Sequence, residues 1–453
     1  MMILQLKDSN YINGENSGYK SQKEIRTYLQ AIDKLKKSIN NKDVESFSLE
    51  NGFLKEIDED IIWYSYNNSN EATFFSSHYI GYYSTVVGKE DIDIEIKPRF
   101  GNGIFNHLLS HAYGIYIPKS DVTSSSNTKS NNLWLITIMW KAILEKAITK
   151  SQIPKEYKSY EKNSSKFKGK LQISKHLKNN LIDKSKFYCK YRKLTMNTII
   201  NQTIRYTYKL LVKKQKGLSN ILKDIAEYDN TLQSFGVEDR EISSFEIKNI
   251  RYSKLNIYYK KVMELSLLII KSESSKNDNK SFKKYGFSYF IDIAELWENY
   301  LLKVLQKNLP EYNIYSPNEN GGEYLLEDNY RRIRPDIIIE KNGVVVAILD
   351  AKYKFYNRLG ATAQYGISRD DLYQMSTYLY HYADKNSNTI GLFISPVKGK
   401  EIKSLKHNNK HNIGILGLNI EQFKDTEEFV SNEIYEEEQI FIQKLQGLLN
   451  API

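Results

Sequence analysis

The sequence predicts a multidomain protein of mixed α+β and α/β class, with a small β-rich N-terminal domain, a helical basic middle and a C-terminal α/β domain. Three observations support this prediction. Apolar and charged residues alternate as in strands before residue 120, helical patterns with a large positive charge fill the middle of the chain, and two Val/Ile-rich runs lie between helix-like segments near the C-terminal end. We therefore expect domains at residues 1–120, 133–272 and 285–453.

The composition is that of an ordinary globular protein. The chain has 453 residues, of which 41% are hydrophobic and 26% charged, and a formal net charge of +11. The start lacks a signal-peptide pattern, and the longest uncharged apolar stretch is far too short to cross a membrane. The single cysteine, Cys189, excludes a disulfide framework and a thiolate zinc site. The seven histidines are interpreted as structural or surface residues. We expect a cytoplasmic protein with no contact to a membrane.

The N-terminal domain is predicted from a hairpin. Strand-like segments at residues 79–87 and 92–97 flank the turn Gly88-Lys89, and the second segment alternates isoleucine with charged residues. Such alternation predicts a strand with one buried face and one face toward water. Pro98 follows and ends the strand, because proline cannot donate to a sheet.

The middle of the chain is predicted to be helical and strongly basic. Residues 141–216 hold 21 Lys or Arg against four acidic residues. Such a segment can neutralise several phosphates and hold DNA without reading its sequence, although a solvated helical surface would have the same composition. The expected helices are 133–149, 195–216, 219–228 and 252–271, between polar linkers at 120–132 and 272–283. The candidate DNA contacts are Lys166, Lys168, Lys170, Lys175, Arg192 and Arg205.

The C-terminal domain is predicted from a second hairpin. Two apolar runs, residues 337–339 and 344–349, are separated by Glu-Lys-Asn-Gly, in which Asn-Gly is a strong hairpin signal. In this pairing Asp336 starts the first strand and Asp350 ends the second, so both carboxylates lie at the same end of the sheet. Lys352 is two residues beyond Asp350, so its side chain points to the same face.

Two acids and a lysine on one face predict a hard-metal site. Mg²⁺ prefers oxygen ligands and takes one or two carboxylates, with water and phosphate oxygens in the remaining positions. Such an ion can neutralise charge that develops on a phosphate, while a lysine orients water or stabilises the anion. The implied reaction is phosphodiester hydrolysis. The alternative is that these charged residues only end two buried strands, because the bare pattern is short.

Flanking segments add further candidates. Residues 291–307 have the pattern of an amphipathic helix with Glu298 near its apolar edge, which makes Glu298 a candidate third carboxylate; Glu295, one turn away, is the alternative. Downstream, Ser368-x-x-Asp371 predicts the start of a helix that continues through residue 380. Gln374 and Tyr378 lie one turn apart on the same face of that helix. Residues 389–394 predict another apolar strand.

These residues, in the order helix, strand, strand, helix, strand, resemble the PD-(D/E)XK nuclease superfamily, including the Gln-x-x-x-Tyr element of some members. Arg-Pro-Asp, Leu-Asp-Ala-Lys-Tyr-Lys and Asp-Leu-Tyr-Gln-Met are similar to the nuclease half of McrC proteins, the endonuclease subunits of McrBC methylcytosine restriction systems. The resemblance implies a restriction-endonuclease-like fold with Mg²⁺ as its cofactor. The implied site residues are Asp336, Asp350 and Glu298 as metal ligands, Lys352 as the catalytic lysine, and Gln374 and Tyr378 beside them.

The resemblance extends to the first two domains. Tyr-Ile-Gly-Tyr followed by Ile-Glu-Ile-Lys-Pro-Arg-Phe resembles the N-terminal domain of McrC proteins, which in that family docks to the hexameric AAA+ GTPase McrB. The middle region resembles a Gly-Arg-Leu element and an Asn-x-x-x-Asn-Arg element of the family. In this sequence Lys170 and Gln202 stand where arginines are expected.

The expected function is therefore that of a Mg²⁺-dependent DNA endonuclease subunit of a GTPase-driven, modification-dependent restriction system. The expected partners are double-stranded DNA and a McrB-like AAA+ GTPase hexamer. No Gly-x-x-x-x-Gly-Lys-Ser/Thr motif occurs in the sequence, so nucleotide hydrolysis is expected from the partner. Two alternatives stay open: a non-enzymatic DNA-binding adaptor that activates the GTPase, and a stand-alone nuclease of the same superfamily in repair or defence.

Overall fold

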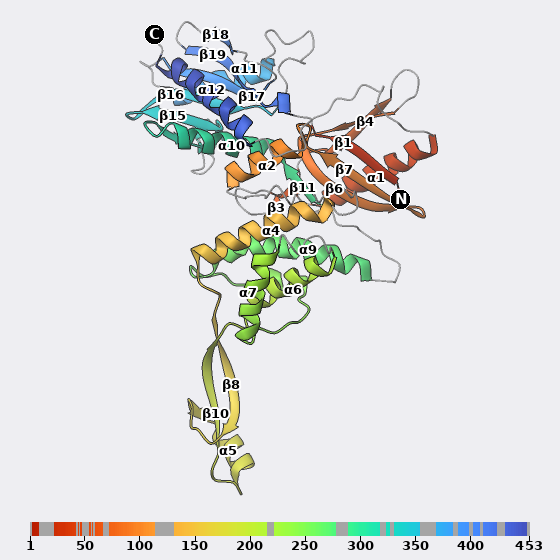
Figure 1. Ribbon diagram of the computed structural model, residues 1–453, viewed down its shortest axis with the longest axis vertical. Coiled ribbons are helices and arrows are strands. Elements are labelled where there is room, and N and C mark those ends of the chain that lie inside the picture. Colours follow the sequence, from red (N-terminus) through yellow and green to blue (C-terminus); the bar gives the residue numbers. More distant parts are fainter. Residues whose placement is uncertain are drawn as a thin grey trace. The chain divides into compact units, whose positions relative to one another are not determined.

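A computed structural model divides the chain into two compact units (Figure 1). The first unit combines Met1–Ser124 with Lys280–Ile453, and the second, Ser125–Asn279, is inserted between these two segments of sequence. The structure describes residues 2–8, 22–41, 44, 46–47, 54–55, 57, 59–66, 72–113, 131–214, 222–277, 289–317, 323–326, 330–353, 368–383, 388–397, 402–407, 411–423 and 431–450.

The N-terminal segment of the first unit forms most of a six-stranded sheet in the order β1-β7-β6-β11-β2-β3. The predicted hairpin is confirmed, because β6 and β7 pair antiparallel. One face of this sheet packs on α1, where Tyr28, Ile32 and Leu35 are buried. Asp93 on β7 is also buried, so the expectation that its face of the strand is fully wet is wrong there. The elements are β1 (Met2–Lys7), α1 (Gln22–Asn40), β2 (Ser46–Phe47), β3 (Leu54–Lys55), β4 (Ile62–Tyr66), β5 (Ala72–Ser76), β6 (Tyr79–Val87), β7 (Glu90–Lys97) and α2 (Gly101–Tyr113).

One strand of this N-terminal sheet comes from the other side of the insertion. Strand β11 (Tyr289–Asp292) pairs antiparallel with β6 and parallel with β2. Gly81 permits the close approach of β6 and β11, because a Cβ at this position would collide with the backbone of Tyr289. The three-domain division stays a prediction. In the structure, the segment expected to begin the C-terminal domain completes the N-terminal sheet instead.

The C-terminal segment builds a second six-stranded sheet, in the order β12-β15-β16-β17-β19-β18. Strands β16, β17 and β19 are parallel, and the remaining neighbours are antiparallel. The elements are α10 (Ile293–Asn308), β12 (Asn313–Tyr315), β13 (Glu323–Leu326), β14 (Tyr330–Ile333), β15 (Ile337–Lys341), β16 (Val344–Ala351), α11 (Arg369–Tyr382), β17 (Ile390–Pro396), β18 (Ile402–His407), β19 (His411–Leu418), the 3₁₀ turn η7 (Glu421–Phe423) and α12 (Ser431–Leu449).

Helices cover both faces of this second sheet. Met375 and Leu379 of α11 pack with Ile338 and Ile348 of the central hairpin in one buried cluster. Helices α10 and α12 contact the sheet on the opposite side, and Trp297 of α10 donates its indole N–H to the end of β17. The sheet is thus sandwiched between helices, which explains why its central strands are apolar on both faces.

The second unit consists of a helical body and a long antiparallel arm. The body contains α4 (Asn131–Lys150), α6 (Ile199–Lys214), α7 (Lys223–Ser234), α8 (Ser244–Lys248), the 3₁₀ turn η3 (Ile257–Tyr259) and α9 (Lys260–Asn277). The arm, residues 156–195, contains β8 (Glu156–Ser164), β9 (Lys170–Leu171), α5 (Ile173–Asn180) and β10 (Phe187–Thr195), with β8 and β9 both paired antiparallel to β10. We call this segment the basic arm.

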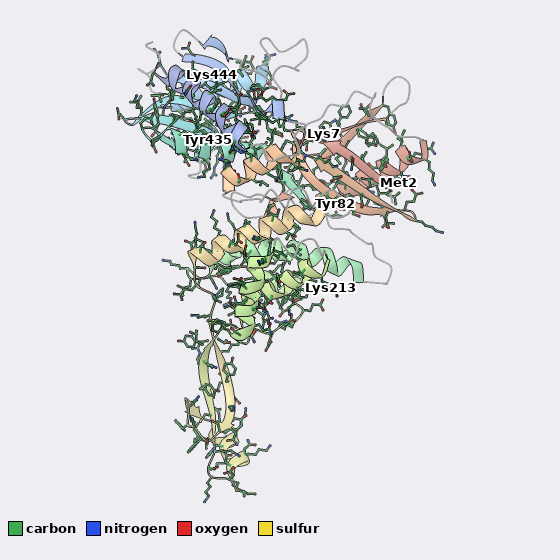
Figure 2. All side chains as sticks on the ribbon, in the orientation of Figure 1. Met2, Lys7, Tyr82, Lys213, Tyr435 and Lys444 are labelled. Atoms are coloured by element: carbon green, nitrogen blue, oxygen red, sulfur yellow. The ribbon has the colours of Figure 1, made fainter. Side chains whose placement is uncertain are left out.

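The basic arm corrects the prediction of a helical middle region, because the segment between the first two predicted helices forms an antiparallel hairpin. Its strands bury only Cys189, and Figure 2 shows side chains projecting on both sides of the hairpin. The expected linkers also differ from the structure: residues 272–277 continue α9, and residues 278–283 and 120–130 lie outside the described part of the chain. No helix among the described residues is long and apolar enough to cross a membrane.

Candidate functional site

The predicted carboxylate pair is brought together by the β15–β16 hairpin. Asn342 and Gly343 have φ values of 53° and 80°, as a two-residue turn of type I′ requires, so the predicted turn is confirmed. The register then shifts by one residue at a β-bulge next to Ile339. Beyond the bulge Ile337 pairs with Leu349, so continuing this register places Asp336 opposite Asp350. Without the bulge the two acids would be out of step by one residue and would point to opposite faces.

Lys352 connects this acid pair to α11. Its Nζ lies 2.6 Å from Oδ2 of Asp350 and donates a hydrogen bond of 2.9 Å to Oε1 of Gln374. Gln374 in turn donates to the hydroxyl of Tyr378 at 2.7 Å, and Tyr378 donates to the backbone carbonyl of Arg334 at 3.0 Å. The lysine is therefore held from two sides, by an acid near the end of β16 and by a hydrogen-bonded pair on α11.

The start of α11 agrees with the sequence prediction and adds a residue that the prediction missed. Ser368 caps the helix by accepting a hydrogen bond of 3.1 Å from the backbone N–H of Asp371. The buried carboxylate of Asp371 also lies 3.4 Å from Nζ of Lys352. In the sequence Asp371 served only as a capping signal. Its position in the first turn of the helix that carries Gln374 was the one available hint that it would reach the lysine.

Glu298 stands beside the acid pair on α10. The helix begins at Ile293, two residues later than expected, because residues 289–292 form β11 and Asp292 caps the helix through the N–H groups of Ala294 and Glu295. Burial and the charges of Asp336, Asp292, Glu295 and Asp350 together raise the pKa of Glu298 well above its usual value. Among the described residues, the carboxylate oxygens of Glu298, Asp336 and Asp350 do not all lie within 4.8 Å of one another.

The electrostatics of the pair are those of carboxylates crowded together. Burial, and then the charge of Asp350, raise the pKa of Asp336 well above its usual value. Burial also raises the pKa of Asp350, which Lys352 partly offsets. Burial alone would lower the pKa of Lys352, but the carboxylates of Asp350, Asp371 and Asp336 outweigh it and raise that pKa. The site therefore concentrates negative charge, with one ammonium group beside it.

This donor set fits a hard divalent cation. One oxygen of Asp336 accepts a hydrogen bond of 2.7 Å from the backbone N–H of Ala351, which fixes its carboxylate at the sheet end. Asp350 is only 2% exposed, so its charge has little solvent to stabilise it. Two buried carboxylates whose pKa values are both raised would be stabilised by an ion such as Mg²⁺, which prefers carboxylate oxygens.

A buried contact ties this site to the N-terminal sheet. Arg99, which follows β7, donates through Nη2 to the carbonyl of Tyr353 at 2.7 Å, and its guanidinium lies 4.1 Å from the centre of the Tyr353 ring. Tyr353 comes directly after Lys352. The backbone N–H of Arg99 donates to the buried carboxylate of Asp8 at the end of β1. No local sequence pattern indicates this contact, because its residues are far apart in the chain.

Most of the candidate DNA-binding residues lie on the basic arm. Lys168, Lys175 and Arg192 place their charges over the rings of Tyr191, Tyr188 and Tyr157, at 5.9, 5.6 and 5.5 Å from the ring centres respectively. Lys175 is also ion-paired with Glu161. Lys166 and Lys170 are exposed on the same arm. These cations thus lie on an exposed hairpin, in the segment between the helices predicted at 133–149 and 195–216.

Arg205 corrects the prediction for that residue. It belongs to α6 in the helical body, its side chain is buried, and its Nε donates to Asp229 at 2.7 Å. A second donor reaches the backbone carbonyl of Val237. Its donors are thus used inside the body, so the expectation that Arg205 contacts DNA is wrong. Gln202, one turn before it, is likewise buried.

Comparison with known proteins places these features in a family. The family model described as "McrBC 5-methylcytosine restriction system component" matches residues 76–394, which is most of the chain and includes the acid pair, Lys352 and the basic arm. The chain belongs to this McrBC family. The site described above lies within the region of this McrBC family member that the family model matches.

Two relatives extend the comparison. The type IV methyl-directed restriction enzyme EcoKMcrBC of Escherichia coli K12 is 21% identical over 327 residues, covering 70% of this chain and 91% of the relative. A chain of the Thermococcus gammatolerans assembly described as McrB AAA+ hexamers with bound McrC is 17% identical, with a TM-score of 0.59, and the match covers 99% of this McrBC family member and 100% of that chain. At this identity the second comparison shows a shared fold.

Proposed function

We propose that this chain is the Mg²⁺-dependent DNA endonuclease subunit of a GTPase-driven, modification-dependent McrBC restriction complex, working in the cytoplasm. The observation that carries the proposal is the cluster of Asp336, Asp350 and Lys352 at one end of the β15–β16 hairpin. The succession of α10, β15, β16, α11 and β17 supports assignment of this part of the chain to the PD-(D/E)XK nucleases.

Each residue of the cluster has a proposed role. Asp336 and Asp350, with Glu298 from α10, would hold Mg²⁺, which would neutralise the charge that develops on the scissile phosphate. Lys352 would orient the attacking water and stabilise the anion, because its ammonium group lies 2.6 Å from Asp350 and the charge of Asp336 also acts on it. Gln374 and Tyr378 would keep Lys352 in place through the hydrogen bonds that link them.

We further propose that a McrB-like AAA+ GTPase hexamer supplies nucleotide hydrolysis and binds through the N-terminal domain, residues 1–120. The shared fold with a chain from an assembly of McrB hexamers and McrC supports a partner of this kind. The contact of Arg99 with Tyr353 would connect the docked sheet to the residue after Lys352. Double-stranded DNA would contact the basic arm through its exposed cations, chiefly Lys166, Lys168, Lys170 and Arg192.

The test is cleavage of methylated plasmid DNA by the wild-type chain and by Lys352→Ala, with Mg²⁺, a McrB-like AAA+ protein from the same genome, and GTP. We expect cutting that needs every component and is lost in the variant. Stimulation of GTP hydrolysis by both forms, with no cutting by either, would instead favour the non-enzymatic adaptor. Efficient cutting by the wild type without the AAA+ protein would favour a stand-alone nuclease.

A further inference from the structure

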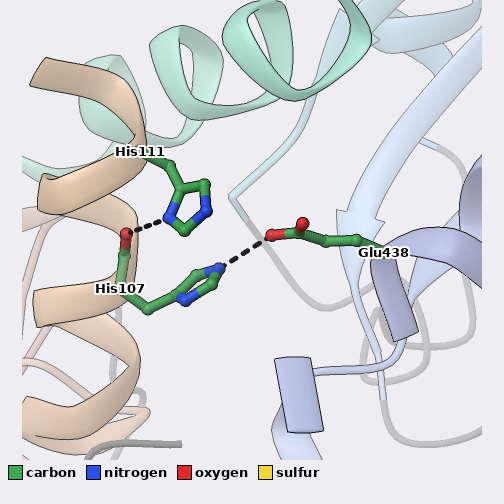
Figure 3. A group of neighbouring side chains, drawn as sticks. All are labelled: His107, His111 and Glu438. Atoms are coloured by element: carbon green, nitrogen blue, oxygen red, sulfur yellow. Dashed lines mark hydrogen bonds and ion pairs between the residues drawn. The ribbon is translucent and has the colours of Figure 1, made fainter. Parts of the chain in front are cut away.

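A second cluster of metal-ligating side chains lies outside the proposed nuclease site. Among the described residues, one ligand atom each from His107, His111 and Glu438 lies within 4.8 Å of the others (Figure 3). The two histidines are on α2 and the glutamate is on α12, 331 positions along the chain from His107. His107 and Glu438 are buried, at 0% and 2% exposure.

We propose that His107, His111 and Glu438 bind a divalent transition-metal ion, Zn²⁺ by their donor set, which joins α2 to α12. Two imidazoles and a carboxylate are a ligand set found in tetrahedral zinc sites, in which a fourth position is taken by water. Mg²⁺ and Ca²⁺ do not suit this set, because they prefer oxygen ligands throughout. The proposal is independent of the nuclease assignment.

The spacing of the histidines supports this assignment. His107 and His111 are four residues apart on one helix, so they occupy the same face one turn apart. Their ring centres lie 4.1 Å apart with a tilt of 30°. In Figure 3 the ring nitrogen of His111 that makes no drawn bond points toward the same space as Nε2 of His107 and the carboxylate of Glu438. This spacing is visible in the sequence, and the interpretation of all seven histidines as structural or surface residues overlooked it.

The hydrogen bonds around His111 orient it as a ligand. Its Nδ1 lies 3.1 Å from the backbone carbonyl of His107 and 3.2 Å from the hydroxyl of Ser110, which itself donates to that carbonyl at 3.0 Å. A carbonyl can only accept, so Nδ1 of His111 carries the proton and Nε2 keeps its lone pair. A bond from the second ring nitrogen to a carbonyl is the usual support of a metal-bound histidine.

The third ligand is held by α10. Oε1 of Glu438 accepts a hydrogen bond of 2.6 Å from the hydroxyl of Tyr300 and lies 2.7 Å from Nε2 of His107. Two ligands of a tetrahedral Zn²⁺ lie roughly 3.3 Å apart, so these two atoms would separate by about 0.6 Å when the ion replaces the proton between them. The ion would thereby fix α2, α10 and α12 around one point.

The experiment uses the full-length chain without an affinity tag, stripped with EDTA, loaded with ZnCl₂ in excess Mg²⁺ and desalted before its zinc is measured by mass spectrometry. We expect about one equivalent of Zn²⁺ in the wild type and in His381→Gln, a control histidine on α11, and at least about a tenfold weaker affinity in His111→Gln and Glu438→Gln. The Tm of the wild type should rise by about 4 °C with saturating Zn²⁺, and that of the two ligand variants should not.

Glu438→Gln separates a metal site from a metal-free hydrogen-bonded cluster. The glutamine oxygen can still accept from Tyr300 and His107, so a hydrogen-bonded cluster would tolerate the change, whereas a metal site loses its anionic ligand. Equal zinc in the wild type and both ligand variants, or none in the wild type, would overturn the proposal. If the variants fail to fold, Co²⁺ added to the wild type decides: tetrahedral absorption bands support the site, and their absence rejects it.

Discussion

The first unit and the basic arm use charged residues in opposite ways. In the first unit a few charges are buried: Asp8 is 0% exposed, Asp350 2% and Arg99 8%, and each has a partner in contact. On the arm the charges are numerous and exposed. Lys175 and Lys190, for example, both pair with Glu161, and their side chains are 53% and 50% exposed. A buried charge acts through its position, whereas exposed charges act through their sum, so substitutions in the two regions should have different consequences.

The largest effect is expected for Asp350→Asn. The change keeps the shape of the side chain but removes half of the carboxylate pair, so DNA cleavage in the complete system should fall by at least about 100-fold. DNA binding should stay unchanged. Asp370→Asn, an exposed neighbour on α11, is the matched control and should cleave like the wild type. A similar loss of cleavage in both variants would show that position does not distinguish these acids.

Arg99→Ala should be the most destabilising of these changes. It removes the guanidinium whose Nε lies 4.0 Å from Oδ2 of buried Asp8, and with it the contact with Tyr353, while the backbone N–H bond to Asp8 stays. The free energy of unfolding of the first unit should therefore fall by about 3–5 kcal/mol. Arg192→Ala on the arm should change the free energy of unfolding of the second unit by less than about 0.5 kcal/mol. Denaturant unfolding of both variants measures the difference, and equal losses would contradict the contrast between buried and exposed arginines.

The pH dependence of stability should reveal Asp8. Burial raises the pKa of Asp8 from 3.8 to about 6, although Arg99 partly offsets this effect. The folded state therefore binds the proton more tightly than the unfolded state, so stability from this group is present below pH 4 and is lost as the pH rises to about 6. Relative to Asp8→Asn, the wild type should lose up to about 3 kcal/mol across this range. Parallel stability curves for the two proteins would contradict the prediction.

The smallest effect per residue is expected on the arm. Changing Lys168, Lys170, Lys190 and Arg192 together to alanine should weaken binding to duplex DNA about tenfold at moderate salt and reduce the slope of log affinity against log salt by about 3–4. The Tm should not change. Exchanging lysine for arginine, and arginine for lysine, at the same four positions keeps the charge and is the control. Unchanged affinity in the alanine variant would remove the arm from the proposed DNA contacts.

The C-terminal sheet was predictable because its strands are buried. The runs 337–339 and 344–349 and the Asn-Gly turn between them identified the hairpin, and the capping signal at Ser368 identified α11. The bulge that aligns Asp336 with Asp350 was not predictable, because one extra residue leaves no trace in an apolar run. The site could be expected from residue types, but its alignment depends on a register that only the structure shows.

The second unit was harder to predict because its arm has no apolar face. Periodicity identifies a strand through the side that it buries, and β8 buries none of its residues. A count of positive residues also gives no information on which of them are buried. Arg205 was therefore grouped with the exposed lysines of the arm, although it pairs with Asp229 inside the helical body. Local patterns likewise cannot show a partner such as β11, which lies far along the chain from β6.

The position of β11 delays completion of the N-terminal sheet during synthesis of the chain. About 190 residues separate β7 from the strand that joins β6 to β2, so at about 5–20 residues per second a ribosome needs roughly 10–40 s to supply it. During this time the whole second unit leaves the ribosome. Strands β1, β7 and β6 of the N-terminal sheet meanwhile leave the edge of β6 unpaired. An unpaired edge can join other chains, so the nascent protein depends on protection from aggregation until residue 292 has left the ribosome.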